Sequence, residues 1–447
     1  MLGSKALIRF LCTSSRCQRK LAPVIQGEWR ADSYPNIKSI LKNPERMSES
    51  LMKRILVNSQ KEADELIDRL AIDYQEYQDC LETDKQVKEE WARNRKLLSG
   101  LEKHDKIAEV RQSKAALESA KERLLETSHS FPNILSGTNQ KYGPRFPILS
   151  AKLKVFNERL NAPSLVTLGA FDSLTQVNTG LNYLVGEKAL AELDLAHYTA
   201  EFLESVDFTE ISVPNFVRYE VAHEHGLLDH DSQDVYTLQS KAELHQNAGA
   251  SDHRKVDNDR KEKTEDNYIF QAPGLSETTL YSFFLRRRLP VSMLPLRFFA
   301  LGNRYRKPHT GMPVQSKVAM LISALSTVKK AEEEFGDLVN IISSFWENLE
   351  VPIVLSVVEP HNLYLHEAAA IEFKMQADNW WRSRAKKQLI ENSVFPVLSR
   401  LSVSYDYVSS RMMTHAKFDQ VNDEFCHFVT AELIDINGLL DSLESKY

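Results

Sequence analysis

The sequence predicts an α+β protein that combines an N-terminal antiparallel helical hairpin, or coiled coil, with an antiparallel sheet flanked by helices. Apolar residues recur at helical spacing through 48–130, a stretch with one glycine and no proline. Beyond 140, helical and strand-like segments alternate without a regular period, and no glycine-rich phosphate loop follows a strand. That order favours an antiparallel sheet over a doubly wound parallel one.

Composition narrows the class of protein. A chain of 447 residues is too long for one ordinary core, so two or three domains are expected. The net charge of -6 excludes a globally basic nucleic-acid binder but leaves room for a local basic patch. Neither a disulfide framework nor a structural zinc site is expected from the four scattered cysteines, which are Cys12, Cys17, Cys80 and Cys426. The sequence lacks a run of apolar residues long enough to predict a membrane span.

The first 27 residues differ from the rest in charge. They contain basic residues, serines and short apolar runs, and the first acidic residue is Glu28. This composition predicts a mitochondrial transit peptide over 1–27 and a location in the mitochondrial matrix. A disordered basic tail is the alternative.

The segment 36–130 is predicted to form the hairpin domain. Its arms meet at a break over 99–105 that contains Gly100, and Phe131-Pro132-Asn133 ends the second arm because proline halts a helix. Acidic residues dominate the first part of the first arm. Seven basic residues lie in the distal part, namely Arg93, Arg95, Lys96, Lys103, Lys106, Arg111 and Lys114. The distal part is either a solvated coiled-coil surface or a tip that contacts RNA phosphates.

The segment 140–447 is predicted to form the second domain. Expected helices are 187–205, 329–349 and 419–443, and expected strands are 210–213, 297–301, 351–358, 370–375 and 401–405. A polar stretch over 241–266 is interpreted as a surface insertion.

Several short sequence motifs follow one another in an order that is typical of a known protein family. The hairpin and its Phe131-Pro132-Asn133 end come first, followed by a long helix over 189–208 and the strand Ile211-Ser212-Val213-Pro214. Leu294-Pro295-Leu296-Arg297-Phe298 and Tyr305-Arg306 complete the series. With these motifs the chain resembles the seryl-tRNA synthetases, which are class II aminoacyl-tRNA synthetases. The resemblance implies a class II synthetase-like core, a hairpin that binds tRNA, and pairing of subunits through the long helix and the Pro-ended strand.

The residues that carry the chemistry in that family are mostly replaced. Where the family has Thr-x-Glu for serine recognition, this chain is expected to have Ala272-Pro273-Gly274, which offers no countercharge to an ammonium group. The Arg-x-Glu of the second motif becomes Arg306-Lys307-Pro308, so Arg306 is either a vestigial phosphate ligand or a structural ion-pair partner. A Lys-Val-Glu that helps to hold substrate becomes Lys317-Val318-Ala319.

Metal and nucleotide binding are not expected either. The stretch 397–404, where the family has a carboxylate for magnesium, contains no acid. The third motif is expected at 421–428, which lacks the family's glycines and has Cys426 near the position of the family's phosphate-binding Arg. We interpret His361, His366, His415 and His427 as isolated structural histidines, and His223 and His225 as a weak metal pair without a third ligand. The prediction is therefore no catalytic residue, no cofactor and no metal.

The leading hypothesis is a pseudoenzyme. With its predicted transit peptide, its synthetase-like motifs and the replaced residues within them, the chain resembles a degenerate paralogue of mitochondrial seryl-tRNA synthetase that insects carry. Such a protein would bind mitochondrial tRNA for serine or another RNA, and would pair with the authentic mitochondrial enzyme or with itself, in a regulatory or structural role. One alternative is a residual serine-tRNA ligase or an ATP-binding enzyme of changed specificity. Another is a protein-binding scaffold that contacts no RNA.

Overall fold

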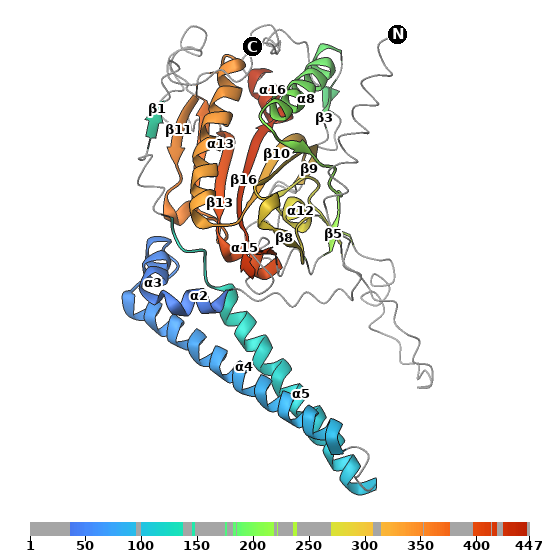
Figure 1. Cartoon of the computed structure of the whole chain (residues 1–447). Coiled ribbons are helices and arrows are strands. Elements are labelled where there is room, and N and C mark those ends of the chain that lie inside the picture. The colour runs from blue at the N-terminus through green and yellow to red at the C-terminus, as the bar shows by residue number, and fades with distance from the viewer. Residues whose placement is uncertain are drawn as a thin grey trace, which may run out of the picture. The chain divides into compact units, whose positions relative to one another are not determined.

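The computed structural model describes residues 36–94, 100–136, 145–147, 175–176, 182–184, 186–218, 221, 236–238, 270–306, 314–351, 353–375, 397–412, 414–417 and 423–444. The predicted transit peptide, the polar insertion and the pair His223 and His225 lie outside the described residues. The α+β class is confirmed, with a helical N-terminal region and a large, mostly antiparallel sheet (Figure 1). None of the described helices is long and apolar enough to cross a membrane.

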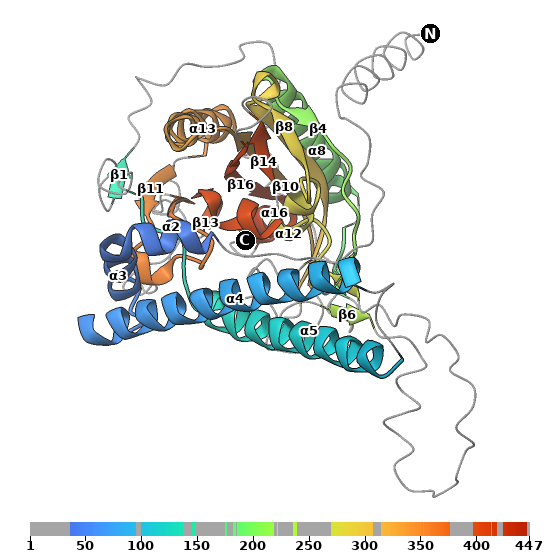
Figure 2. The same ribbon diagram turned by 60° about the horizontal axis from the view of Figure 1, so that its bottom comes forward.

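The predicted hairpin consists of α4 (Gln60–Asn94) and α5 (Gly100–His129), which lie side by side along their length (Figures 1 and 2). Several acids of the first arm are turned towards the second arm. Asp73 accepts a hydrogen bond from Thr127 at 2.6 Å, and buried Asp84 accepts one from Ser113 at 3.1 Å. Part of the acidity of the first arm thus joins the two helices.

Two short helices that the sequence analysis did not predict close the base of the hairpin. Helix α2 (Ile37–Lys42) ends two residues before Pro44, which starts α3 (Pro44–Lys53). Proline is tolerated at the first position of a helix but cannot continue one, so the chain turns here. The apolar faces of α2 and α3 pack on α4 and α5 around Leu51, Leu70, Leu124 and Phe131.

The sheet of the second domain has the strand order β1-β11-β12-β13-β16-β10-β9-β4. All neighbouring strands are antiparallel except the β4–β9 pair. The strands are β1 (Arg145–Pro147), β4 (Thr209–Glu210), β9 (Leu296–Arg306), β10 (Val314–Leu325), β11 (Ile353–Val357), β12 (Ala369–Met375), β13 (Val397–Ser404) and β16 (His427–Asp435).

One face of the sheet is covered by α8 (Glu187–Ser205), α13 (Val328–Asn348) and α16 (Ile436–Glu444). Helix α13 begins at Thr327, whose hydroxyl caps the Lys330 amide at 3.3 Å. Near its other end, the Trp346 indole donates to the Ser399 hydroxyl of β13 at 2.7 Å. The main apolar core lies between these helices and the sheet.

Smaller elements lie around this frame. A three-stranded sheet contains β5 (Val217–Arg218), β6 (Tyr236–Leu238) and β7 (Phe270–Ala272), and a second one contains β8 (Arg288–Pro290), β14 (His415–Lys417) and β15 (Asp423–Phe425). The pair β2 (Thr175–Gln176) and β3 (Asn182–Tyr183), the helices α12 (Glu277–Ser282) and α15 (Asp406–Met412), and the 3-10 turns η2 (Val291–Met293) and η3 (Pro360–Asn362) complete the described part.

Two predicted elements differ from the structure. Of the expected strand 210–213, only Glu210 lies in a strand, the two-residue β4. The expected helix over 419–443 is instead β15, the central strand β16 and then α16. In β16, Val429, Ala431 and Leu433 face the core, whereas Thr430 and Glu432 bind polar partners on the other face. This alternation of apolar and polar residues is typical of a strand, but it is short and therefore a weak signal in the sequence.

Candidate functional site

The candidate site lies on the sheet face opposite α13, which we call the site face. Successive residues of a strand point to opposite faces. On β13, Ser399 contacts Trp346 of α13, whereas Ser402 lies 2.9 Å from the Thr430 hydroxyl, towards α12. The site face therefore carries the polar side chains of β9, β12, β13 and β16, and α12 packs over part of it.

The structure corrects the position of the carboxylate that the sequence analysis expected to be missing. Gly274 has a φ of +66, and a Cβ there would lie 2.0 Å from the Asn303 carbonyl oxygen. No side chain, and hence no carboxylate, fits at this position. Glu277, three residues later, instead places a carboxylate over the site face from the start of α12. The Ser276–Thr279 capping box, which fixes the start of this helix, was the sequence signal that could have revealed it.

Both oxygens of the Glu277 carboxylate are bound by side chains of the chain itself. Oε2 lies 2.8 Å from His366 Nε2, and Oε1 accepts a hydrogen bond from the Thr430 hydroxyl at 2.9 Å. The His366 ring stacks on Tyr364 and meets the Tyr281 ring edge-on. His366 is thus not isolated, as the sequence analysis assumed, because its partner is 89 residues away in the chain.

Burial and ion pairing have opposite effects on the pKa values of Glu277 and His366. Burial favours the uncharged form of Glu277, but the charge of His366 and the hydrogen bonds from His366 and Thr430 hold the Glu277 pKa below its ordinary value. Burial likewise disfavours charged His366, yet the nearby Glu277 carboxylate raises the pKa of His366 above its ordinary value. The two groups therefore form a buried ion pair.

A second charge network surrounds Arg400 of β13. Its guanidinium binds both oxygens of buried Glu367, at 2.6 and 3.0 Å, and the Glu372 carboxylate at 2.8 Å. Glu372 also binds Lys374 at 2.9 Å. The stretch 397–404, expected to lack a metal ligand, thus presents a cation, and the neighbouring carboxylates are bound to it. Among the described residues, no group of three His, Cys, Asp or Glu side chains could hold a metal ion.

A third network lies further along the site face. Arg304 of β9 is largely buried and binds the carboxylates of Glu432 and Asp435, the second at 3.1 Å. Arg306 is the last residue of β9 and pairs with Val314 of β10, while its side chain and Lys307-Pro308 lie outside the described residues. Ala319 is fully buried in the apolar core, on the opposite sheet face from Arg304.

The remaining predicted positions are not assembled with these networks. Cys426, matched to a phosphate-binding position, lies between β15 and β16, and burial raises the pKa of its thiol to about 12. His415 stacks on Phe425 with the ring centroids 4.7 Å apart, and burial lowers the pKa of His427. The exposed His361 lies 3.5 Å from Glu359.

Four of the predicted RNA-binding residues are exposed on the hairpin, and a fifth is bound in ion pairs. Arg93, Lys103, Arg111 and Lys114 are exposed on α4 and α5. Lys103 and Lys114 are eleven residues, or about three helical turns, apart and so share one side of α5. Lys106 is bound by Glu90 and Glu109, each at 2.8 Å, so its charge is already balanced. Arg95 and Lys96 lie outside the described residues.

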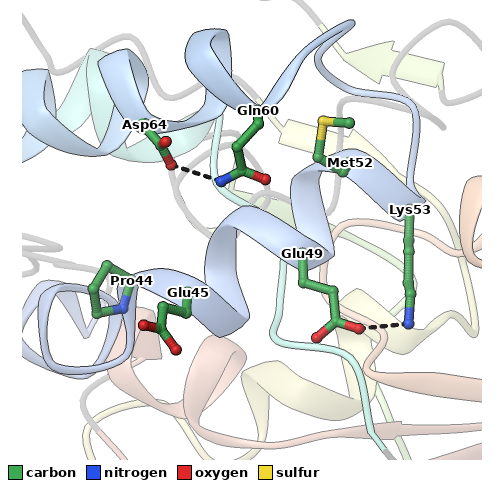
Figure 3. Close-up of a pocket in the computed structure, with 7 residues that line it drawn as sticks. All are labelled: Pro44, Glu45, Glu49, Met52, Lys53, Gln60 and Asp64. Atoms are coloured by element: carbon green, nitrogen blue, oxygen red, sulfur yellow. Dashed lines mark hydrogen bonds and ion pairs between the residues drawn. The ribbon is translucent and has the colours of Figure 1, made fainter.

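The base of the hairpin has the opposite charge. A hollow of about 630 Å³ lies between α3 and the start of α4 and is lined by Pro44, Glu45, Glu49, Met52, Lys53, Gln60 and Asp64 (Figure 3). Two of its three carboxylates are engaged, since Glu49 binds Lys53 at 2.6 Å and Asp64 accepts from Gln60 at 2.8 Å. Because carboxylates repel phosphates, this hollow does not suit RNA.

The helix matched to the pairing motif has an exposed apolar side. Leu190 and Leu193 of α8 are 60% and 58% exposed, and Phe216, after the Pro-ended strand, is 51% exposed. Residues three apart on a helix are neighbours on its surface, so the two leucines form one apolar strip. Such a strip suits a protein partner better than water.

Comparisons with known proteins agree on the fold. No family model matches the chain, and no curated sequence matches it. The structure is similar to that of cytoplasmic serine-tRNA ligase from Naegleria fowleri in complex with AMP, with a TM-score of 0.63, 18% identity, and coverage of 89% of each chain. It is also similar to seryl-tRNA synthetase from Pyrococcus horikoshii complexed with ATP, with a TM-score of 0.62, 15% identity, and coverage of 91% of this chain and 93% of the other. The fold of the chain is thus the class II fold of seryl-tRNA synthetases.

Replacing Glu277 by Gln should lower the pH at which His366 titrates. In the parent, the ion pair contributes most to stability between the ordinary values of 4.5 for Glu and 6.5 for His. The contribution is lost as pH rises through the raised pKa of His366 and as it falls through the lowered pKa of Glu277. An NMR titration should show the His366 resonance titrating above pH 6.5 in the parent and below it in Glu277→Gln, because the largest effects that oppose burial are then removed and the weaker effect of the Glu367 charge remains. Glu359→Gln, a change at an exposed glutamate, is the control, and an unchanged His366 titration in Glu277→Gln would contradict the pairing.

Proposed function

We propose that this chain is a non-catalytic, synthetase-fold protein of the mitochondrial matrix that binds tRNA or another RNA and pairs with the authentic mitochondrial seryl-tRNA synthetase. Its role would be regulatory or structural. The resemblance to seryl-tRNA synthetases in sequence motifs, together with the shared fold, supports the proposal of a synthetase-fold protein. The basic segment 1–27, free of acids, supports import into mitochondria.

The observation that carries the non-catalytic proposal is the self-pairing of charges on the site face. A site that binds ATP and an amino acid needs charged groups that are free to meet the ligand's phosphates and ammonium. Here Glu277 is bound by His366 and Thr430, Arg400 by Glu367 and Glu372, and Arg304 by Glu432 and Asp435. A ligand would have to break these pairs, and each broken buried pair leaves an uncompensated charge that costs roughly 3–5 kcal/mol.

The carboxylate of Glu277 gives a physical basis for one alternative, in which the chain is an enzyme. If a ligand ammonium displaced His366, the chain could act as a residual serine-tRNA ligase or as an ATP-binding enzyme of changed specificity. The replaced residues argue against serine activation, because the chain has Ala319 where the family has Glu and Pro308 where the second motif ends in Glu.

RNA binding is proposed for the distal part of the hairpin. Exposed Arg93, Lys103, Arg111 and Lys114 lie there, whereas the base of the hairpin carries the acidic hollow. This separation of charge directs a phosphate backbone to the distal part. A scaffold that contacts only protein is the alternative.

Serine activation should be absent. We expect no serine-dependent ATP–pyrophosphate exchange by the purified protein, because the candidate ligand groups are bound to each other and several family residues are replaced. The measurement compares the protein with an active seryl-tRNA synthetase under the same conditions. A rate within about a hundredfold of the active enzyme would refute the proposal, since losing two charge contacts alone should cost roughly 4–10 kcal/mol.

Removing the distal basic residues should weaken RNA binding. The variant with Arg93, Arg95, Lys96 and Arg111 all replaced by Ala should bind mitochondrial tRNA for serine less tightly, and its affinity should depend less steeply on salt. A filter-binding titration across a salt series measures both effects. The control replaces Arg123, which is paired with Glu76 in the proximal part of the hairpin, by Ala. Equal affinity of the quadruple variant and the parent at every salt concentration would favour the scaffold alternative.

Pairing should depend on the apolar strip of α8. The chain co-expressed with mitochondrial seryl-tRNA synthetase should have the mass of a heterodimer, and Leu193→Asp should abolish it because a buried unpaired carboxylate is costly. Native mass spectrometry distinguishes the heterodimer, the self-dimer and the monomer. Ile72→Asp changes a similarly exposed apolar residue on α4 and should leave the mass unchanged. A parent chain that stays monomeric both alone and with the enzyme would rule out the pairing.

A further inference from the structure

Three consecutive arginines, Arg286 to Arg288, follow α12 and lead into β8. We call them the triple-arginine segment. They lie outside both the hairpin and α8.

The backbone of the triple-arginine segment is held in place by long-range hydrogen bonds. The Arg286 amide donates to the Met412 carbonyl at 2.8 Å, and the His415 amide donates to the Arg287 carbonyl at 2.9 Å. Arg286 has a φ of 55, in the left-handed region, which is unfavourable for a non-glycine residue. Such a conformation persists only where surrounding contacts enforce it, and a fixed backbone lowers the ordering cost of binding a ligand.

Arg287 differs from three other arginines of the sheet domain. Arg297, Arg304 and Arg400 each bind a carboxylate, and those carboxylates raise the arginine pKa despite burial. Arg287 makes no ion pair with another described residue, and its guanidinium instead lies 4.4 Å from the centre of the Phe283 ring. Burial lowers the pKa of Arg287, and no carboxylate of the described residues opposes that effect. An external anion would supply the missing countercharge.

The triple-arginine segment leads into an edge strand. Strands β8 and β14 pair in parallel, with His415 opposite Arg288. Strand β15, which contains the exposed Glu424, pairs with β14 from its other edge. In this small sheet the end of the triple-arginine segment therefore lies on the edge away from Glu424.

We propose that the triple-arginine segment binds a phosphate of the RNA backbone, as a second RNA contact separate from the hairpin. The proposal rests on the proposed RNA-binding function. Planar guanidinium groups match phosphate oxygens with paired hydrogen bonds. Aromatic rings accompany the charges, since Phe283 lies under Arg287 and His415 stacks on Phe425 at 4.7 Å. Arginines interleaved with aromatic rings favour nucleic acid over an acidic protein surface.

The test uses the full chain and a labelled transcript of mitochondrial tRNA for serine, titrated between about 50 and 200 mM salt. Arg287→Gln should weaken binding about three- to tenfold and reduce the salt slope by about one. Arg287→Lys keeps the charge but not the planar fork, so its affinity should lie between those of Arg287→Gln and the parent. Lys329→Gln, at an 86% exposed lysine of α13, is the matched control and should bind as the parent does. Thermal unfolding confirms that each variant is folded.

The outcomes separate this proposal from the hairpin proposal. If Arg287→Gln binds with the affinity and salt slope of the parent while the hairpin quadruple variant loses binding, the triple-arginine segment is not an RNA contact and the hairpin function stands. If only Arg287→Gln loses affinity, the segment is the RNA site and the hairpin is not. If the parent does not bind the transcript but binds poly-glutamate through Arg287, the segment contacts acidic protein and the proposal is overturned.

Discussion

The buried guanidinium of Arg54 is the contact on which the junction between hairpin and sheet depends. Arg54 ends α3 and is only 5% exposed, and it donates hydrogen bonds to the carbonyl oxygens of Asn133, Tyr364 and Glu367. Burial lowers the Arg54 pKa to about 10, so the group stays charged at neutral pH. A buried charge is tolerated only when it is well hydrogen-bonded, so the loop 363–367 and the end of α5 must stay where they satisfy it.

The same loop connects this junction to the site face. Asn133 binds the backbone of the loop, with its amide donating to the Leu365 carbonyl at 2.7 Å and its side chain to the His366 carbonyl at 2.9 Å. The side chains of His366 and Glu367 then extend to Glu277 and Arg400. These polar groups thereby hold the hairpin, the loop and the sheet together. Their engagement with one another supports the proposal of a synthetase fold without serine activation.

The charged residues of the hairpin fall into two groups, which are acids paired within the hairpin and exposed basic residues. Near the base and the middle, acids are paired: Asp73 with Thr127, Glu76 with Arg123, and Asp84 with Ser113. Towards the distal end, Lys103, Arg111 and Lys114 remain exposed. Exposed pairs contribute little to stability, whereas exposed like charges on one side of a helix provide a field for a charged partner.

The sequence by itself determined the α+β class, the hairpin, helix α8 with both of its ends, strands β11 and β12 to within two residues, and parts of β9 and β13, because these elements follow from local periodicity and from proline. It did not predict strand β10. The comparison of Ala319 and Pro308 with the glutamates of the resembled family also needs only the order of residues. Tertiary structure alone decided that β16 lies in the middle of the sheet, that Glu277 meets His366, that Lys106 is already paired, and that no carboxylate of the described residues lies beside Arg287. The physical reason is common to all four. Each depends on which distant segments pack together, and neither the place of a strand in a sheet nor the partner of a charge can be read from neighbours in the chain.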